Sequence, residues 1–528
     1  MMDFDVVVIG GGAAGAAVTW KLAKEGLKVA CLERGPWMKP EAYPSTKPDW
    51  ETIKTKSFSP VPARRQSHYD YPIDDKDSPI SVCNFNAVGG STILYSGHFP
   101  RFRKRDFELR TKDGVGEDWP ISYNDLQPYY DLNEKEMGVA GLVGDPAYPE
   151  IEKLLPPVPI GKSGRVLAEA FNKLNWHWWP SYSAISTRQF NGRNACINLG
   201  PCNTGCPQQA KSSADVTYMS RAKNLQAHVI TEAAVSRVVM RGRVAVGVEY
   251  FDASGVKNTV MAKKIVLAAS AVGTPRILLN TKTSDFPNGL ANGEDQVGRN
   301  LMIHPLGLVD GVFDDEIDPD IGPQGCMIYS LQHYRDPEAG HKLGYMMQAL
   351  RGDGPLQAAR FAWLKKRLNF GESLMPDFDA VYRRKLSISV VCEDLAEPEN
   401  RISLDPDASD RYGIAGVKVV YKLHDNTRAS MLSGMKRARQ VMIAAGATKT
   451  YVFGPVRETG WHTMGTCRMG SNPKTSVVNK FGETHGVSNL YIADSSVFTS
   501  GSCVNPANTV QAVALYVADH IIQKLKVA

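Results

Sequence analysis

The chain has 528 residues, of which 43% are hydrophobic and 22% are charged, and its formal net charge at pH 7 is +6. This length exceeds what a single hydrophobic core usually holds, so we expect two or three domains. The small net charge excludes the broad basic footprint of a nucleic-acid-binding protein. No uninterrupted apolar run of 18 residues occurs, so the sequence predicts no transmembrane helix.

The N-terminal segment has the pattern of a dinucleotide-binding turn. An apolar strand is predicted at 5–9, and a Gly-x-Gly-x-x-Gly turn and an apolar helix follow it. The glycines allow a tight turn, let backbone N–H groups approach a pyrophosphate and let the helix pack on the strand. The predicted cofactor-binding residues of this turn are Gly10, Gly12, Ala13, Ala14 and Gly15.

A second apolar strand is predicted at 28–32 and leads into Glu33 and Arg34. An acidic residue about 20 positions after the glycine turn suits the ribose hydroxyls of an unphosphorylated adenosine. We therefore place Glu33 and Arg34 in the predicted cofactor site. The motif alone does not choose between FAD and NAD.

Later elements indicate a mixed α/β chain. Alternating strands are predicted across 228–270, and two further strands across 386–423. Amphipathic helices are predicted at 426–445 and 509–526.

Five sequence blocks resemble the glucose-methanol-choline (GMC) oxidoreductases, a family of FAD enzymes. They are VVVIGGGAAG at 6–15, NAVGGSTILYSG at 86–97, ASAVGTPRILLN at 269–280, VGRNLMIHP at 297–305, and HTMGTCRMG to NPANT across 462–509. The chain departs from the family where Thr281 and Lys282 replace the usual Ser-Gly-x-Gly. The resemblance covers nearly the whole chain and includes the branch of gluconate, fructose and glucoside-3 dehydrogenases.

The resemblance implies a Rossmann-like FAD-binding domain built from discontinuous segments, plus a substrate domain with an antiparallel sheet. The FAD-binding domain is predicted at 1–45, 83–105, 191–300 and 456–528. The substrate domain is predicted at 106–190 and 301–455, and residues 46–82 are predicted as a surface excursion.

The same resemblance implies further cofactor contacts and non-covalent FAD. Some sugar oxidases of the family tether FAD through a histidine where this chain has Leu94, and His98 is the nearest alternative attachment point. The implied contacts are Gly89, Gly90 and Ser91 along the pyrophosphate and ring, Val235 beside the adenine, Asp494 and Ser495 at the ribitol and pyrophosphate, and Asn508 and Thr509 near the flavin edge.

His462 and Asn505 are the predicted catalytic pair. Alcohol oxidation needs a base for the hydroxyl proton while hydride leaves for flavin N5, and histidine suits the base because its ordinary pKa is about 6.5. A polar neighbour should steady the developing alkoxide. The family takes these groups from the blocks that contain His462 and Asn505. We expect His304 to support the flavin domain.

A cysteine-rich loop at 196–207 carries Cys196, Cys202 and Cys206. The loop resembles one that holds a three-iron [3Fe-4S] cluster in related dehydrogenases, so these cysteines are predicted ligands. A disulfide plus a free thiol, and a loop without metal, remain alternatives. Zinc is disfavoured because no fourth ligand stands at ligand-type spacing.

The resemblance favours a secondary hydroxyl of a sugar or glycoside as the substrate, with electrons leaving through the cluster to a cytochrome-type carrier. The aromatic run at 176–179 is either a sugar-stacking surface or core packing. The alternatives are an aryl or aliphatic alcohol oxidase, a quinone-linked dehydrogenase without a cluster, a flavin-fold lyase and a non-catalytic electron-transfer subunit.

The predicted compartment depends on the N-terminus and on partners. The first strand begins at residue 5, so we expect no signal peptide and a cytoplasmic location. Related flavoprotein subunits are exported folded by a small signal-bearing partner, which keeps a periplasmic location open.

Overall fold

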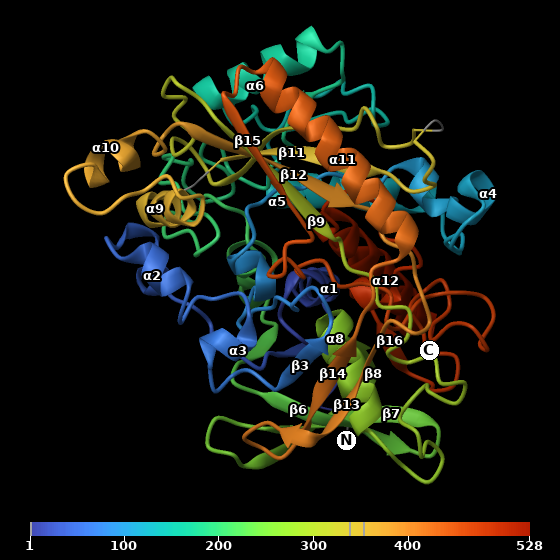
Figure 1. Ribbon diagram of the computed structural model, residues 1–528. Coiled ribbons are helices and arrows are strands. Elements are labelled where there is room, and N and C mark those ends of the chain that lie inside the picture. Colours follow the sequence, from blue (N-terminus) through green and yellow to red (C-terminus); the bar gives the residue numbers. More distant parts are fainter. Residues whose placement is uncertain (1–2, 337–338, 352–353, 528) are drawn as a thin grey trace.

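The computed structural model describes residues 3–336, 339–351 and 354–527. Two large sheets organise the chain: one lies in the lower half of Figure 1 around α1 and α8, and the other in the upper half beneath α11. The predicted class, mixed α/β with parallel and antiparallel sheets, is confirmed. Within the described residues, no helix is both long and apolar enough to cross a bilayer.

The lower sheet has seven strands, in the order β5-β2-β1-β8-β7-β6 with β16 also paired to β8. Strands β1 and β16 both run parallel to β8, so all three end at the same edge of the sheet. The strands are β1 (Phe4–Ile9), β2 (Val29–Leu32), β5 (His228–Ile230), β6 (Ala234–Arg241), β7 (Val244–Phe251), β8 (Lys257–Leu267) and β16 (Leu490–Ile492).

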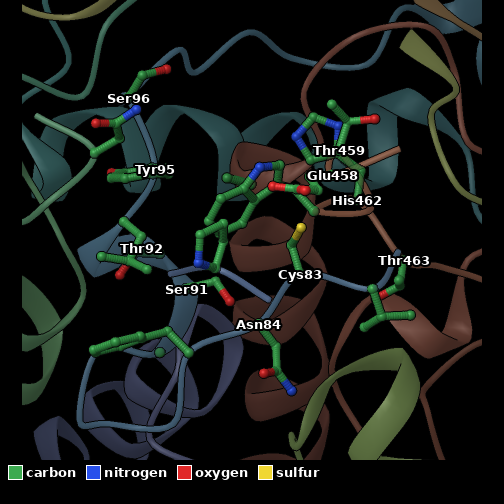
Figure 2. Close-up of a pocket in the computed structure, with 18 of the residues that line it drawn as sticks. Cys83, Asn84, Ser91, Thr92, Tyr95, Ser96, Glu458, Thr459, His462 and Thr463 are labelled. Atoms are coloured by element: carbon green, nitrogen blue, oxygen red, sulfur yellow. The ribbon is translucent and has the colours of Figure 1, made fainter. Parts of the chain in front are cut away.

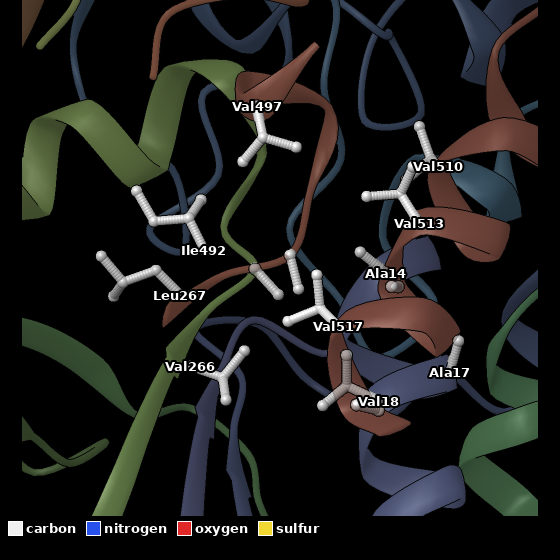
Figure 3. Packing of buried hydrophobic residues seen from close by; sticks show 14 of the residues in the cluster. Ala14, Ala17, Val18, Val266, Leu267, Ile492, Val497, Val510, Val513 and Val517 are labelled. Carbon is white, nitrogen blue, oxygen red and sulfur yellow. The ribbon is translucent and has the colours of Figure 1, made fainter. Parts of the chain in front are cut away.

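Helices α1 (Ala13–Lys24) and α12 (Ala507–Val527) pack together against this sheet. Figure 3 shows Val513 and Val517 of α12 beside Ala14 and Val18 of α1, and all four are buried. The approach of α1 to β1 requires a glycine, because a Cβ at Gly15 would lie 1.8 Å from the Gly10 carbonyl oxygen. The two ends of the chain therefore share one hydrophobic core.

The upper sheet has six strands in the order β15-β9-β12-β11-β10-β4. Helices α6 (Gly161–Lys173) and α11 (Asp425–Ala444) cover one face with apolar side chains. The strands are β4 (Trp179–Pro180), β9 (Leu306–Val312), β10 (Gly325–Ser330), β11 (Tyr345–Arg351), β12 (Lys385–Cys392) and β15 (Lys449–Phe453).

A third sheet is formed by β3 (Ile73–Asp77), β13 (Arg401–Ser409) and β14 (Ala415–Val420). Residues 46–82, predicted as a surface excursion, therefore contribute a strand, and Ile80 and Val82 are buried. The sequence analysis missed β13, because its Pro and Asp residues are depleted in strands. The predicted domain boundaries stay a prediction.

The remaining helices lie around the two large sheets. They are α2 (Trp50–Lys54), α3 (Pro62–Arg65), α4 (Leu109–Asp113), α5 (Tyr123–Met137), α7 (Ser220–Asn224), α8 (Ser270–Asn280), α9 (Pro355–Leu364) and α10 (Leu374–Asp379).

Leu267 tests the shared core at the end of β8. Its side chain is fully buried among the residues of Figure 3. We expect Leu267→Ala to lower the free energy of unfolding by about 2–5 kcal/mol, because it leaves a cavity. Leu432→Ala is the control, since Leu432 is 59% exposed. Equal denaturant midpoints for the two variants would contradict this packing.

Candidate active site

A cavity of about 1190 Å³ has walls from both large sheets. Ile9 and Ala268 come from the edge of the lower sheet, and Leu308 and Gln348 come from the upper sheet. Figure 2 shows part of this wall, in which Ser91 and His462 border the same space. The cavity therefore joins the predicted cofactor residues to the predicted catalytic pair.

Most of the predicted cofactor residues line this cavity. Those in the wall are Gly10, Gly12, Ala13, Ala14, Glu33, Arg34, Gly90, Ser91, Val235, Asp494 and Ser495. Gly15, Gly89, Asn508 and Thr509 lie outside the wall.

Glu33 ties the glycine turn to the end of β2. Its carboxylate accepts hydrogen bonds from the backbone N–H groups of Gly11 at 2.7 Å and Gly35 at 2.8 Å. Burial raises the pKa of Glu33 to about 7. Each carboxylate oxygen keeps a further lone pair that can accept from a ribose hydroxyl.

Arg34 connects the cofactor end of the cavity to the third sheet. Its guanidinium donates to the Tyr69 carbonyl at 2.7 Å and to the Asp410 carboxylate at 2.8 Å. Arg276 donates to the same carboxylate at 2.9 Å. The charge of Arg34 is thus paired within the protein.

Asp494 follows β16 and holds the start of α8. Its Oδ2 accepts from the Ser270 N–H at 2.9 Å and from the Thr274 hydroxyl at 2.6 Å. Ser495 Oγ donates to the Thr463 carbonyl at 2.8 Å, which links this turn to the residue after His462.

Asn508 and Thr509 anchor α12 to α5. Asn508 Oδ1 accepts from Asn133 at 2.8 Å, and Thr509 Oγ1 lies 2.8 Å from the Tyr130 hydroxyl. Ala507 and Val510 line the cavity in their place. Positions three apart share a helix face, so the residues between them point away from the cavity.

The imidazole of His462 lies between Asn505 and His304. Its Nε2 is 3.4 Å from Asn505 Nδ2, and its Nδ1 is 3.0 Å from His304 Nδ1. His304 Nε2 is 2.9 Å from the Gly501 carbonyl oxygen. Asn505 Oδ1 accepts from Gln348 Nε2 at 2.5 Å. The fold therefore brings the two predicted catalytic residues together.

These contacts determine which ring nitrogens carry protons. The Gly501 carbonyl can only accept, so His304 Nε2 donates and a neutral His304 has a bare Nδ1. His462 must then donate from Nδ1, which leaves its Nε2 as an acceptor. Asn505 presents its amide N–H₂ to that nitrogen, because its oxygen is held by Gln348.

Burial keeps this pair of rings neutral. Burial is the main cause that lowers the pKa of His462 well below its ordinary value, and the nearby His304 and His98 add to the effect. Burial also lowers the pKa of His304 to about 4. A neutral His462 with a bare Nε2 has the protonation state that a general base requires.

His98 is a buried histidine in the cavity wall. Its Nδ1 lies 2.6 Å from Ser181 Oγ, and burial lowers its pKa to about 3. The aromatic residues 176–179 lie outside the cavity wall, which favours the packing interpretation of that run.

The sequence analysis missed the polar residues that the upper sheet contributes. Gln348 and Ser389 line the cavity, and Ser389 Oγ donates to Gln348 Oε1 at 3.3 Å. In β12 the serines alternate with Leu386, Ile388 and Val390. That period of two indicates a strand with one polar face, and it could have identified Ser389.

The cysteine loop holds its three thiols near one another. Burial raises the pKa of Cys202, and the nearby Cys206 and Cys196 add to the effect. All nine cysteines, each within the described ranges, are free, which excludes the disulfide alternative. Among the described residues, no group of three or more His, Cys, Asp or Glu side chains is arranged to hold a metal ion. The predicted [3Fe-4S] cluster at Cys196, Cys202 and Cys206 stays a prediction.

The chain matches the GMC oxidoreductase description over residues 4–306 and 396–514. The chain belongs to the GMC oxidoreductase family. It is 38% identical to a 2-methyl-1,2-propanediol dehydrogenase of Mycolicibacterium austroafricanum, over 98% of this chain and 95% of the relative. It is 28% identical to a fructose dehydrogenase large subunit of Gluconobacter japonicus, over 99% of this chain and 99% of that protein.

Solved structures share the fold of this GMC chain. The pyridoxine 4-oxidase from Mesorbium loti aligns with a TM-score of 0.68 at 17% identity, covering 98% of this chain and 99% of that chain. The predicted family is confirmed, and the chain is an oxidoreductase whose family supports FAD as the cofactor.

Glu33→Ala should weaken FAD binding. Above its raised pKa of about 7 Glu33 is ionised, and the loss of a charged acceptor costs about 1.5–3 kcal/mol. We therefore expect Kd to rise roughly 10- to 100-fold in equilibrium titrations of apoprotein with FAD above that pH. Glu25→Ala is the control, because Glu25 is an exposed residue at the end of α1. Unchanged FAD affinity in Glu33→Ala would show that this carboxylate makes no contact with the cofactor.

Proposed function

We propose that the protein is an FAD-dependent dehydrogenase that oxidises an alcohol group, and that the substrate class is a secondary hydroxyl of a sugar or glycoside. The observation that carries the proposal is the bare Nε2 of a neutral His462 beside the Asn505 amide, at the wall of the cavity. Family membership and the names of the dehydrogenase relatives support an alcohol as the reacting group.

The cofactor end of the cavity fits FAD. The Gly12 and Gly90 backbones lie so close that a Cβ at Gly90 would be 2.9 Å from Gly12 Cα, so this wall presents backbone rather than side chains. Glu33 and Val235 would hold the adenosine half, and Ser91, Asp494 and Ser495 the flavin half. When bound, FAD supplies the acceptor for the hydride.

The two catalytic side chains divide the work on the hydroxyl. His462 Nε2 accepts the hydroxyl proton while the C–H bond of the carbon that bears this hydroxyl weakens. Asn505 donates from Nδ2 to the same oxygen and stabilises the negative charge that develops there. His304 accepts from His462 Nδ1, which keeps Nε2 directed at the substrate.

The names of other relatives support the sugar assignment. They include the fructose dehydrogenase large subunit and a paromamine 6'-oxidase of Streptomyces fradiae, 27% identical over 97% of this chain and 90% of that protein. A small 1,2-diol is the second candidate substrate, favoured by the 38% identity to 2-methyl-1,2-propanediol dehydrogenase.

We also propose a separate cytochrome-type carrier as the electron acceptor and a partner subunit. Relatives named as dehydrogenases support the carrier, and the relative named as a large subunit supports the partner. The predicted cluster at the cysteine loop, which would lie on the path to that carrier, stays a prediction.

His462→Ala should slow flavin reduction by the substrate without releasing FAD. Because a general base contributes about 10²–10⁴-fold, we expect the anaerobic rate of flavin bleaching by substrate to fall by this factor. His228→Ala is the control, since His228 is exposed on β5. If His462→Ala reduced its flavin at the wild-type rate, His462 would not be the base.

The pH profile should report the lowered pKa of His462. The neutral base persists until pH falls through that lowered pKa, so kcat/KM should be constant above about pH 6.5 and decline only on the acid side. A profile of kcat/KM from pH 4 to 9 measures this. A rise centred at or above about pH 6.5, the ordinary histidine value, would contradict the account.

A further inference from the structure

Strands β9 and β12 carry polar side chains into the cavity beyond the catalytic pair. Strand β12 carries Lys385, Ser387 and Ser389 at alternate positions. Asp310 of the neighbouring strand β9 lies opposite Ser387. All four line the cavity. They form a polar row that starts beside Gln348, the residue that holds Asn505.

The far part of this row is a hydrogen-bonded group of three side chains. Asp310 Oδ1 accepts from Ser387 Oγ at 2.5 Å and from Lys385 Nζ at 3.3 Å. Lys385 Nζ also lies 3.0 Å from Ser387 Oγ. Asp310 is 3% exposed and Lys385 is 7% exposed. Asp310 Oδ2 accepts no hydrogen bond from any residue in the described ranges.

The strand geometry sets the reach of the row. Two residues of an antiparallel strand span about 6.8 Å, so Ser387 and Asp310 lie roughly 7 Å beyond Ser389, and Lys385 roughly 14 Å. This spacing extends the polar row by about the length of one sugar ring beyond Ser389, which contacts the residue that holds Asn505. A single small alcohol bound at His462 would not reach this group.

The ion pair has no evident role in holding the sheet together. A buried ion pair adds little net stability over apolar residues of similar size, because desolvation opposes the attraction. The opposite face of the same strands is apolar and packs against α6 and α11. The charged groups occur on the face that borders the cavity.

The chemistry of this group matches neighbouring hydroxyls. Asp310 Oδ2 can accept from one hydroxyl and Ser387 Oγ can accept from the next, while Lys385 holds both side chains in place. Phe361 of α9 lies beside the pair, with Lys385 Nζ 5.1 Å from its ring centroid. Phe361 also lines the cavity and offers an apolar surface to the C–H face of a sugar.

We propose that Asp310, Ser387 and Lys385 form a distal subsite that binds vicinal hydroxyls on a second ring of the substrate. The substrate class is then a glycoside of at least two rings, oxidised on the ring nearest His462. This inference rests on the proposed function and distinguishes its two candidate substrates.

Binding and turnover of long and short probes test the subsite. Lactose, sucrose and trehalose serve as two-ring probes, and propane-1,2-diol as the short probe. We expect Asp310→Asn and Ser387→Ala to raise Kd for a two-ring probe by about 10-fold or more in calorimetric titrations of FAD-loaded protein. The kcat/KM for propane-1,2-diol should change less than about twofold, because the diol does not reach the subsite.

Asp145→Asn is the matched control. Asp145 is a buried carboxylate outside the cavity wall, paired with His177 at 2.9 Å, so its substitution should leave both probes unaffected. The milder Ser387→Ala change keeps the test valid if Asp310→Asn fails to fold.

Two results would overturn the subsite. The first is wild-type protein that binds none of the disaccharides more tightly than the diol. The second is a pair of variants that bind a two-ring probe like wild type. Either result leaves the proposed function intact if an alcohol still bleaches the flavin. Absence of bleaching by every alcohol, with disaccharide binding lost only in the variants, would refute the oxidation and keep the subsite.

Discussion

The pairing of strand β8 with two distant segments is the constraint on which the site depends. Strand β1 and strand β16 each run parallel to its final residues, so the chain leaves both strands at one edge of the sheet. Gly10 follows β1 and Asp494 follows β16, and both line the same cavity. Helices α1 and α12 pack together, and His462 and Asn505, which precede α12, line the same cavity as the glycine turn. The hydrophobic core and the catalytic site both depend on the pairing of β1 and β16 with β8.

Within the cavity, a chain of hydrogen bonds determines which ring nitrogen of His462 carries the proton. The Gly501 carbonyl orients His304, His304 orients His462, and Gln348 orients Asn505. Burial alone would lower the pKa of His462 but would leave its tautomer undetermined. The hydrogen bonds determine the tautomer, so the lone pair at Nε2 faces the cavity. Gln348 of β11 and Ser389 of β12 extend this chain of hydrogen bonds, so the upper sheet is linked to the catalytic pair.

The sequence predicted the parts of the site that local pattern encodes. The glycine turn, Glu33 and the His462 block are short motifs with a chemical reason for each residue, and the structure gathers most of them in one cavity. Asn508 and Thr509 lie outside the cavity wall, because helix phase rather than motif membership decides which side chains of α12 face the cavity. The cysteine spacing predicts a metal site, but spacing alone does not determine which group, if any, three neighbouring thiols hold. Gln348 and Asp310 were missed because isolated polar residues in strands acquire meaning only from the cross-strand pairing.

The most direct test of this account is the ring protonation of His462 in the FAD-loaded protein. Nitrogen-15 NMR of histidine-labelled enzyme, assigned by comparison with the His462→Ala variant, distinguishes protonated from bare ring nitrogens. The account predicts a proton on Nδ1 and none on Nε2 at neutral pH, with that preference lost when His304 is replaced by Phe. A protonated Nε2, or a tautomer unaffected by His304→Phe, would contradict it.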